Sequence, residues 1–94
     1  MRVPLTVEQA LNREAVVQRL LTVAVAGLEA GGEADLGVAE DALRFASEIA
    51  PDDRRVLDGL GAIAWRRCRV QEAKELFQRA IAADPAYSRP YAHL

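Results

Sequence analysis

The stretch that decides the fold is Leu57–Pro85, LDGLGAIAWRRCRVQEAKELFQRAIAADP. In it, apolar and small residues recur every three or four positions, a spacing that places them on one face of an α-helix. The first predicted helix shares the face Leu57, Leu60, Gly61 and Ala64, and the second shares Val70, Ala73, Phe77, Ala80 and Ile81. The small residues let two helix backbones approach closely, and Asp84-Pro85 ends the second helix because proline lacks an N–H and disfavours helix in the residue before it.

The same pattern recurs 34 residues earlier in the chain. In that register Gly61 falls on Gly27, and Pro85 falls on Pro51. The remaining coincidences, earlier residue first, are Ala30 with Ala64, Leu36 with Val70, Ala39 with Ala73, Leu43 with Phe77 and Ala46 with Ala80. A glycine, a proline and an apolar set that coincide in one register predict a repeat protein.

These residues resemble the tetratricopeptide repeat, a 34-residue helix–turn–helix unit with the signature W-x2-L-G-x2-Y…A-x3-F…P. The second copy carries Leu60-Gly61, Ala73 and Phe77, with Leu57 in place of the tryptophan and Ala64 in place of the tyrosine. The resemblance covers roughly residues 20 to 94. It implies an all-α fold in which antiparallel helix–turn–helix repeats stack as a short right-handed superhelix, an α–α solenoid.

The repeat register divides the chain into four segments. We expect residues 1–19 to be an N-terminal arm and the start of the first helix, and residues 20–53 to be a degenerate first repeat. Residues 54–87 form the second repeat, and residues 88–94 a truncated third repeat or a capping helix. In that last segment Tyr91 and Leu94 occupy the places of Leu57 and Leu60.

Local signals predict where the first helix begins and ends. Thr6-x2-Gln9 has the form of a capping box, in which each side chain bonds the backbone N–H of the other residue. Helix-favouring residues follow to about Ala30, as one long helix or as two with a bend near Asn12, and Gly31-Gly32 ends the run.

The later helices are predicted in the same way. Asp35 is expected to cap the second helix, and Asp52 or Asp53 the third. Arg44 and Glu48 stand one turn apart on the exposed side of the second helix, which predicts an ion pair. The expected ranges are about 36–49, 53–67 and 70–83.

The segment Val16–Leu28, VVQRLLTVAVAGL, is apolar nearly all round. A helix of this kind needs cover on every side, and its own hairpin partner covers only one. Two explanations stand. Either the chain self-associates, with Val16–Leu28 and residues 88–94 burying each other's apolar surface, or it is a piece of a longer array. We expect a homodimer or a higher homo-oligomer.

Charge and composition narrow the class of partner. The net charge of −2 gives no basis for a nucleic-acid or membrane partner. No apolar run approaches the roughly 20 residues of a membrane span, and MRVPLTVEQ has no apolar segment like that of a signal peptide. The single cysteine fits a reducing compartment. We therefore expect a cytoplasmic protein.

The sequence carries no recognisable catalytic or metal-binding set. His93 lies two residues from the end of the sequence, and Cys68 has neither a nearby base nor companion ligands. Gly31-Gly32 follows no strand and precedes no lysine, so it is not a phosphate-binding loop. We predict that the chain is not an enzyme and holds no cofactor and no metal.

The resemblance implies instead a concave groove, lined by the first helix of each repeat, that receives a peptide or a partner helix. By position, its partner-binding residues in the first repeat are Leu21, Ala24, Val25 and Leu28. In the second repeat and the terminal segment they are Arg55, Asp58, Ala62, Trp65, Arg66, Arg69, Arg89 and Tyr91. Trp65 is either an interface anchor, since Trp and Arg are enriched at hot spots, or a space-filling residue against the first repeat.

Three functions follow from these expectations. The first is a non-catalytic scaffold or adaptor that binds a protein partner and self-associates. The second is a small chaperone of similar fold that holds an apolar segment of a secreted or assembled client in the Leu21–Leu28 groove. The third is an accessory subunit of an enzyme complex.

Overall fold

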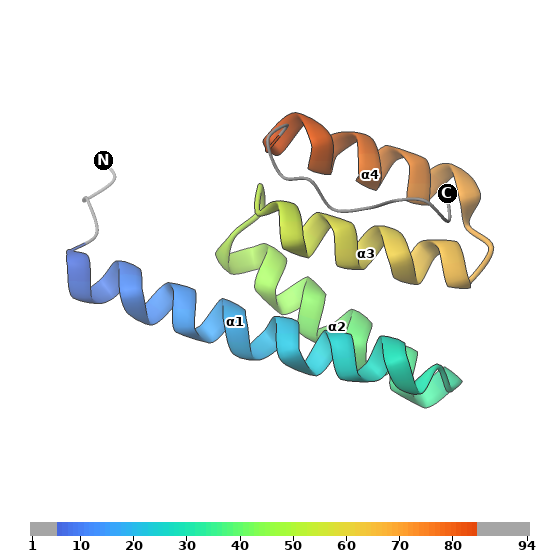
Figure 1. The fold of residues 1–94 in the computed structure, drawn as a ribbon, viewed down its shortest axis with the longest axis horizontal. Coiled ribbons are helices and arrows are strands. Elements are labelled where there is room, and N and C mark those ends of the chain that lie inside the picture. Colours follow the sequence, from blue (N-terminus) through green and yellow to red (C-terminus); the bar gives the residue numbers. More distant parts are fainter. Residues whose placement is uncertain (1–5, 85–94) are drawn as a thin grey trace.

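The computed structural model describes residues 6–84, which form four α-helices and no strand (Figure 1). They are α1 (Val7–Ala30), α2 (Glu33–Ile49), α3 (Arg54–Arg66) and α4 (Val70–Ala83). Consecutive helices pair as two hairpins, α1 with α2 and α3 with α4, and α3 also packs against both helices of the first hairpin. Within residues 6–84, α4 packs only against α3. The predicted all-α class is confirmed.

Helix α1 has the predicted ends and is a single helix. The N–H of Gln9 donates to the Thr6 hydroxyl at 3.1 Å, and the N–H of Thr6 donates to the Gln9 side-chain oxygen at 3.0 Å. Gly31 follows the helix with φ 76°, and its N–H donates to the carbonyl of Gly27. A left-handed residue at this place is glycine's usual role at a helix end, because glycine has no Cβ to clash.

Helix α2 corrects two predictions. It begins at Glu33 after the extended residue Gly32, so Asp35 lies inside the first turn and is not the N-cap. Carboxylates there suit the positive end of the helix dipole. Arg44 pairs with Glu40 at 3.0 Å and not with Glu48. The acid-before-base order at this spacing is the more favourable one, which explains the choice.

Of the two caps predicted for α3, Asp53 is the one observed, since its carboxylate accepts from the N–H of Arg55 at 2.9 Å. It ends in a Schellman motif. The N–H of Arg69 donates to the carbonyl of Ala64, and the N–H of Cys68 donates to that of Trp65. Cys68 holds the left-handed position of the motif with φ 61°.

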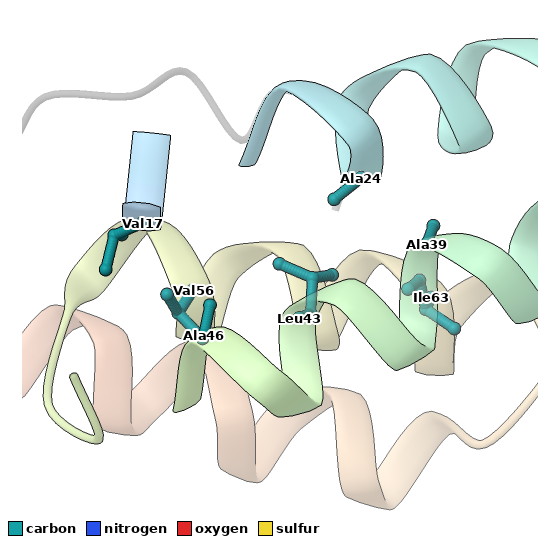
Figure 2. Close-up of a cluster of buried hydrophobic side chains, with 7 residues drawn as sticks. All are labelled: Val17, Ala24, Ala39, Leu43, Ala46, Val56 and Ile63. Atoms are coloured by element: carbon teal, nitrogen blue, oxygen red, sulfur yellow. The ribbon is translucent and has the colours of Figure 1, made fainter. Parts of the chain in front are cut away.

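The core lies where α1, α2 and α3 meet (Figure 2). Small residues bring the helices close, as predicted. A Cβ on Gly27 would stand 2.5 Å from the carbonyl oxygen of Asp35, and one on Gly61 would stand 2.8 Å from the ring of Phe77. The buried cluster consists of Val17 and Ala24 from α1, Ala39, Leu43 and Ala46 from α2, and Val56 and Ile63 from α3.

Two residues assigned to the core face of α4 are exposed. Val70 and Ile81 are 46% and 49% exposed, whereas Ala73 and Ala80 are buried as predicted. Leu36, which holds the place of Val70 in α2, is buried because α2 has helices on two sides. Val70 and Ile81 remain exposed because, within residues 6–84, α4 packs only against α3.

Three arginines each bond the carboxyl end of a helix to which they do not belong. Arg13 of α1 donates to the carbonyl of Ile49 at the end of α2, and Arg66 of α3 donates to that of Leu28 in the last turn of α1. Arg54 of α3 donates to the carbonyl of Asp84, the C-cap of α4. None of these three helices has a basic residue in its own last turn. The arginines therefore supply donors for orphan carbonyls and positive charge at the negative end of each dipole.

Candidate interaction groove

An open cavity of about 540 Å³ lies between α1 and α3. One wall is formed by α1, whose side chains recur there with helical spacing from Gln18 to Glu29. The opposite wall is formed by α3, and Leu43 of α2 and Phe77 of α4 also line the cavity. We call this cavity the α1–α3 groove.

Most of the residues predicted to bind a partner meet in this groove. Those that line it are Leu21, Ala24, Val25 and Leu28 from α1, and Arg55, Asp58 and Ala62 from α3. They come from residues 21–28 and 55–62, two segments that the 34-residue register places at equivalent positions. Their partner-binding role stays a prediction.

Other predicted residues lie elsewhere. Trp65 is 44% exposed and does not line the groove. Arg66 donates a hydrogen bond to the carbonyl of Leu28 in the last turn of α1. Arg69 lies beside a different cavity of about 400 Å³, which α2, α3 and α4 line with mostly charged and polar side chains. Arg89 and Tyr91 lie outside the described residues.

The α1 wall of the groove is mainly apolar and accessible, although Gln18, Thr22 and Glu29 line it as well. Val25 is 47% exposed, and Leu21 and Leu28 are half-buried. Ala62 faces them from α3 with a side chain too small to close the space. This part of the groove can bury apolar side chains of a ligand, at about 25 cal/mol per Å² of surface removed from water.

One end of the groove is polar, but its charges are already paired. Arg55 donates to Glu14 of α1 at 2.8 Å and to the Asp53 carboxylate at 2.6 Å. These hydrogen bonds from Arg55 lower the pKa of both Glu14 and Asp53, and the two carboxylates in turn raise the pKa of Arg55. Because Arg55 already serves two carboxylates, it is poorly placed to hold the terminal carboxylate of a peptide.

Asp58 belongs to a buried ion pair that the sequence analysis missed. Arg54 and Asp58 have side chains only 5% and 3% exposed, and their charged atoms lie 3.4 Å apart. The signal was present, since an arginine and an aspartate four residues apart share one face of a helix. The carboxylate of Asp58 is therefore a structural group, and an apolar ligand matches the groove better than a basic one.

No metal or membrane signature accompanies the groove. Within residues 6–84, no three His, Cys, Asp or Glu side chains are grouped so that they could hold a metal ion. None of the described helices combines the length and the apolarity that crossing a membrane requires. Cys68 is a free, exposed thiol.

No protein-family model, no curated protein and no solved structure matches this chain.

Proposed function

We propose that the chain is a non-catalytic protein–protein interaction module of the tetratricopeptide type, which binds an apolar peptide or partner helix in the α1–α3 groove. The groove carries this proposal. Its accessible wall is mainly apolar, the charges of Arg55 and Asp58 are paired within the chain, and seven residues that the repeat register selected line it.

The correspondence between the two hairpins supports a repeat of this type. Helices α2 and α4 end 34 residues apart, at Ile49 and Ala83. The residues that follow have similar backbone angles, φ −137° and ψ 76° at Ala50 and φ −149° and ψ 84° at Asp84. Ala46 and Ala80, at equivalent places, are both fully buried. Such agreement is expected of two copies of one unit stacked as a short solenoid.

A selection of random phage-displayed peptides on the full chain tests the groove. We expect enriched peptides to carry two or three large apolar residues, to bind the wild type, and to lose about tenfold or more in affinity to the Val25→Glu variant, because the new carboxylate would be desolvated beneath the ligand. Backbone amide shifts on titration with such a peptide should cluster at Leu21, Val25 and Ala62.

The Val23→Glu variant is the matched control. Val23 has the same side chain, lies on the same helix and is 43% exposed, but it does not line the groove. Peptides that bind Val25→Glu as tightly as wild type, or shifts that cluster away from α1 and α3, would contradict the proposal.

A further inference from the structure

The back of the first hairpin carries four exposed apolar side chains. Val16 and Val23 of α1 are each 43% exposed, and Val38 and Phe45 of α2 are 55% and 57% exposed. Large exposed apolar side chains that gather on one face of a protein mark an interaction site more often than scattered ones do. None of the four lines the α1–α3 groove.

These residues point away from α3. Positions two residues apart on a helix lie about 200° apart around its axis. Val16 and Val23 each come two residues after a side chain that faces α3, namely Glu14, which pairs with Arg55, and Leu21, which lines the groove. On α2, Val38 comes two residues before Glu40, which bonds Arg67, the residue that follows α3. We call the face that holds Val16, Val23, Val38 and Phe45 the back face.

On each helix the two back-face residues are seven positions apart, and residues that are already half-buried or buried complete an alternating spacing of four and three. On α1 the half-buried Leu20 stands between Val16 and Val23. On α2 the buried Ala42 follows Val38, and the half-buried Ile49 follows Phe45. This is the spacing of helices that pack nearly parallel or antiparallel to one another with side chains interlocked, as in four-helix bundles. A hairpin with such a row on each helix matches a second hairpin of the same kind.

The contacts between α1 and α2 fix which residues stand level. Arg13 bonds the carbonyl of Ile49. A Cβ on Gly27 would meet the carbonyl oxygen of Asp35 at 2.5 Å and the Cβ of Ala39 at 2.9 Å, so each step forward along α1 corresponds to a step back along α2. Val16 is then within about three residues of the level of Phe45, and Val23 within about three residues of Val38. At about 1.5 Å of rise per residue, these apolar pairs would meet if α1 of one copy lay across α2 of another.

The charges beside the back face favour that same arrangement. Arg19 borders the row on α1, on the side away from α2, and Asp41 borders the row on α2, on the side away from α1. The two stand about three residues apart in level, and within residues 6–84 no ion pair involves either of them. An arrangement that lays α1 on α2 of the second copy brings opposite charges together, whereas one that lays α1 on α1 brings Arg19 to Arg19.

We propose that the back face is the docking site for a second copy of this chain. The two hairpins pack face to face about a two-fold axis parallel to the helices, with each α1 against α2 of the other copy, and form a four-helix bundle. Such an axis closes the assembly at two copies. The α1–α3 grooves stay open on the outer sides, so this proposal is independent of the proposed function.

Light scattering across a dilution series from about 200 to about 1 µM tests the docking. We expect a mass of twice 10.3 kDa at the upper end. The Val23→Glu variant should raise the dissociation constant at least about a hundredfold, because two carboxylates would be buried in each dimer. The Val25→Glu variant should keep the wild-type mass, and circular dichroism establishes that both variants are folded. A wild type that is monomeric at every concentration, or a Val25→Glu variant as monomeric as Val23→Glu, would overturn the proposal.

A charge exchange tests the arrangement. We expect Arg19→Glu and Asp41→Arg each to weaken the dimer by about tenfold and the double variant to regain most of the loss, because like charges at an interface repel. On a Cys68→Ser background, oxidation of a mixture of Val23→Cys and Val38→Cys chains should give a covalent heterodimer, and Val23→Cys alone should give none. Cross-linking of Val23→Cys alone would overturn the proposed arrangement.

Discussion

Cys68 is the one non-glycine residue among those described with a left-handed backbone, at φ 61°. The conformation is imposed by the Schellman motif, whose two hydrogen bonds require it. For an L-residue with a Cβ this conformation costs roughly 1–2 kcal/mol, which glycine avoids. Against this, the greater freedom of glycine in the unfolded chain opposes folding by about 0.5–1 kcal/mol. The thiol is exposed and contributes little packing.

We therefore predict that Cys68→Gly stabilises the protein by about 0.5–1 kcal/mol and raises Tm by about 3–6 °C, measured by thermal unfolding followed by circular dichroism. Cys68→Ala is the control, because it removes the thiol and keeps the left-handed strain, and its Tm should stay within about 2 °C of wild type. A Cys68→Gly protein that melts below the wild type would show that the thiol, and not the backbone, matters at this position.

At the scale of single elements, the ends of α1, α2 and α4 depend on arginines from other helices. Replacement of Arg66 by methionine keeps most of the apolar stem and removes the donor to the Leu28 carbonyl. We expect a loss of about 1 kcal/mol in the free energy of unfolding, and faster hydrogen exchange at the N–H of Gly31, which closes the last turn of α1.

Arg79→Met is the control for that loss. Arg79 is exposed on α4 and forms no hydrogen bond or ion pair with any other residue of 6–84. Its replacement should leave both measurements unchanged. If the N–H of Gly31 exchanges equally fast in the Arg66→Met and Arg79→Met variants, the hydrogen bond from Arg66 to Leu28 does not stabilise the end of α1.

The helix ends also show what the sequence could predict. Two helix caps, the Thr6–Gln9 capping box of α1 and Asp53 at the start of α3, bond backbone groups only a few residues away. Their pattern is local, so it can be recognised in the sequence. Arg66 bonds a carbonyl 38 residues away. Nothing in the sequence near Arg66 identifies that acceptor, because a long side chain finds it only after the hairpins have packed.

The same distinction applies to the groove. The 34-residue register placed Leu21 and Ala62 on facing walls because both repeats follow one geometry. It failed for Arg69, because the helix ends after Arg66 and the left-handed residue Cys68 turns the chain toward the second cavity. The register also failed for Trp65, which lies inside α3 but is turned away from the groove, so helical spacing alone does not decide which face meets the neighbouring hairpin.

At the scale of the whole molecule, ion pairs join the two hairpins at both ends of α3. Arg55 bonds Glu14 of α1, and Arg67 bonds Glu40 of α2. Hydrogen bonds from these arginines hold the pKa of Glu14 and the pKa of Glu40 below their ordinary value of 4.5, and Arg55 holds the pKa of Asp53 below 3.8. A carboxyl group with a lowered pKa in the folded state adds stability that is complete above its pKa in the unfolded chain and is lost as pH falls through its pKa in the folded state.

We therefore predict that the difference in the free energy of unfolding between wild type and Arg55→Met depends on pH only in acid. Because the pairs are partly exposed, the wild type should be more stable by about 0.5–1 kcal/mol at neutral pH. The difference should stay constant down to about pH 5 and vanish as pH falls further, once Glu14 and Asp53 are protonated in both states. Urea unfolding at a series of pH values measures this difference, and subtraction removes the contribution of every group that titrates alike in the two proteins.

The Lys74→Met variant is the control, because it removes a positive charge from α4 that has no ion-pair partner within residues 6–84. Its stability should follow the wild-type curve at every pH. A constant difference that persists to the lowest pH would mean that Arg55 stabilises the join between the hairpins by the packing of its stem and not by its charge.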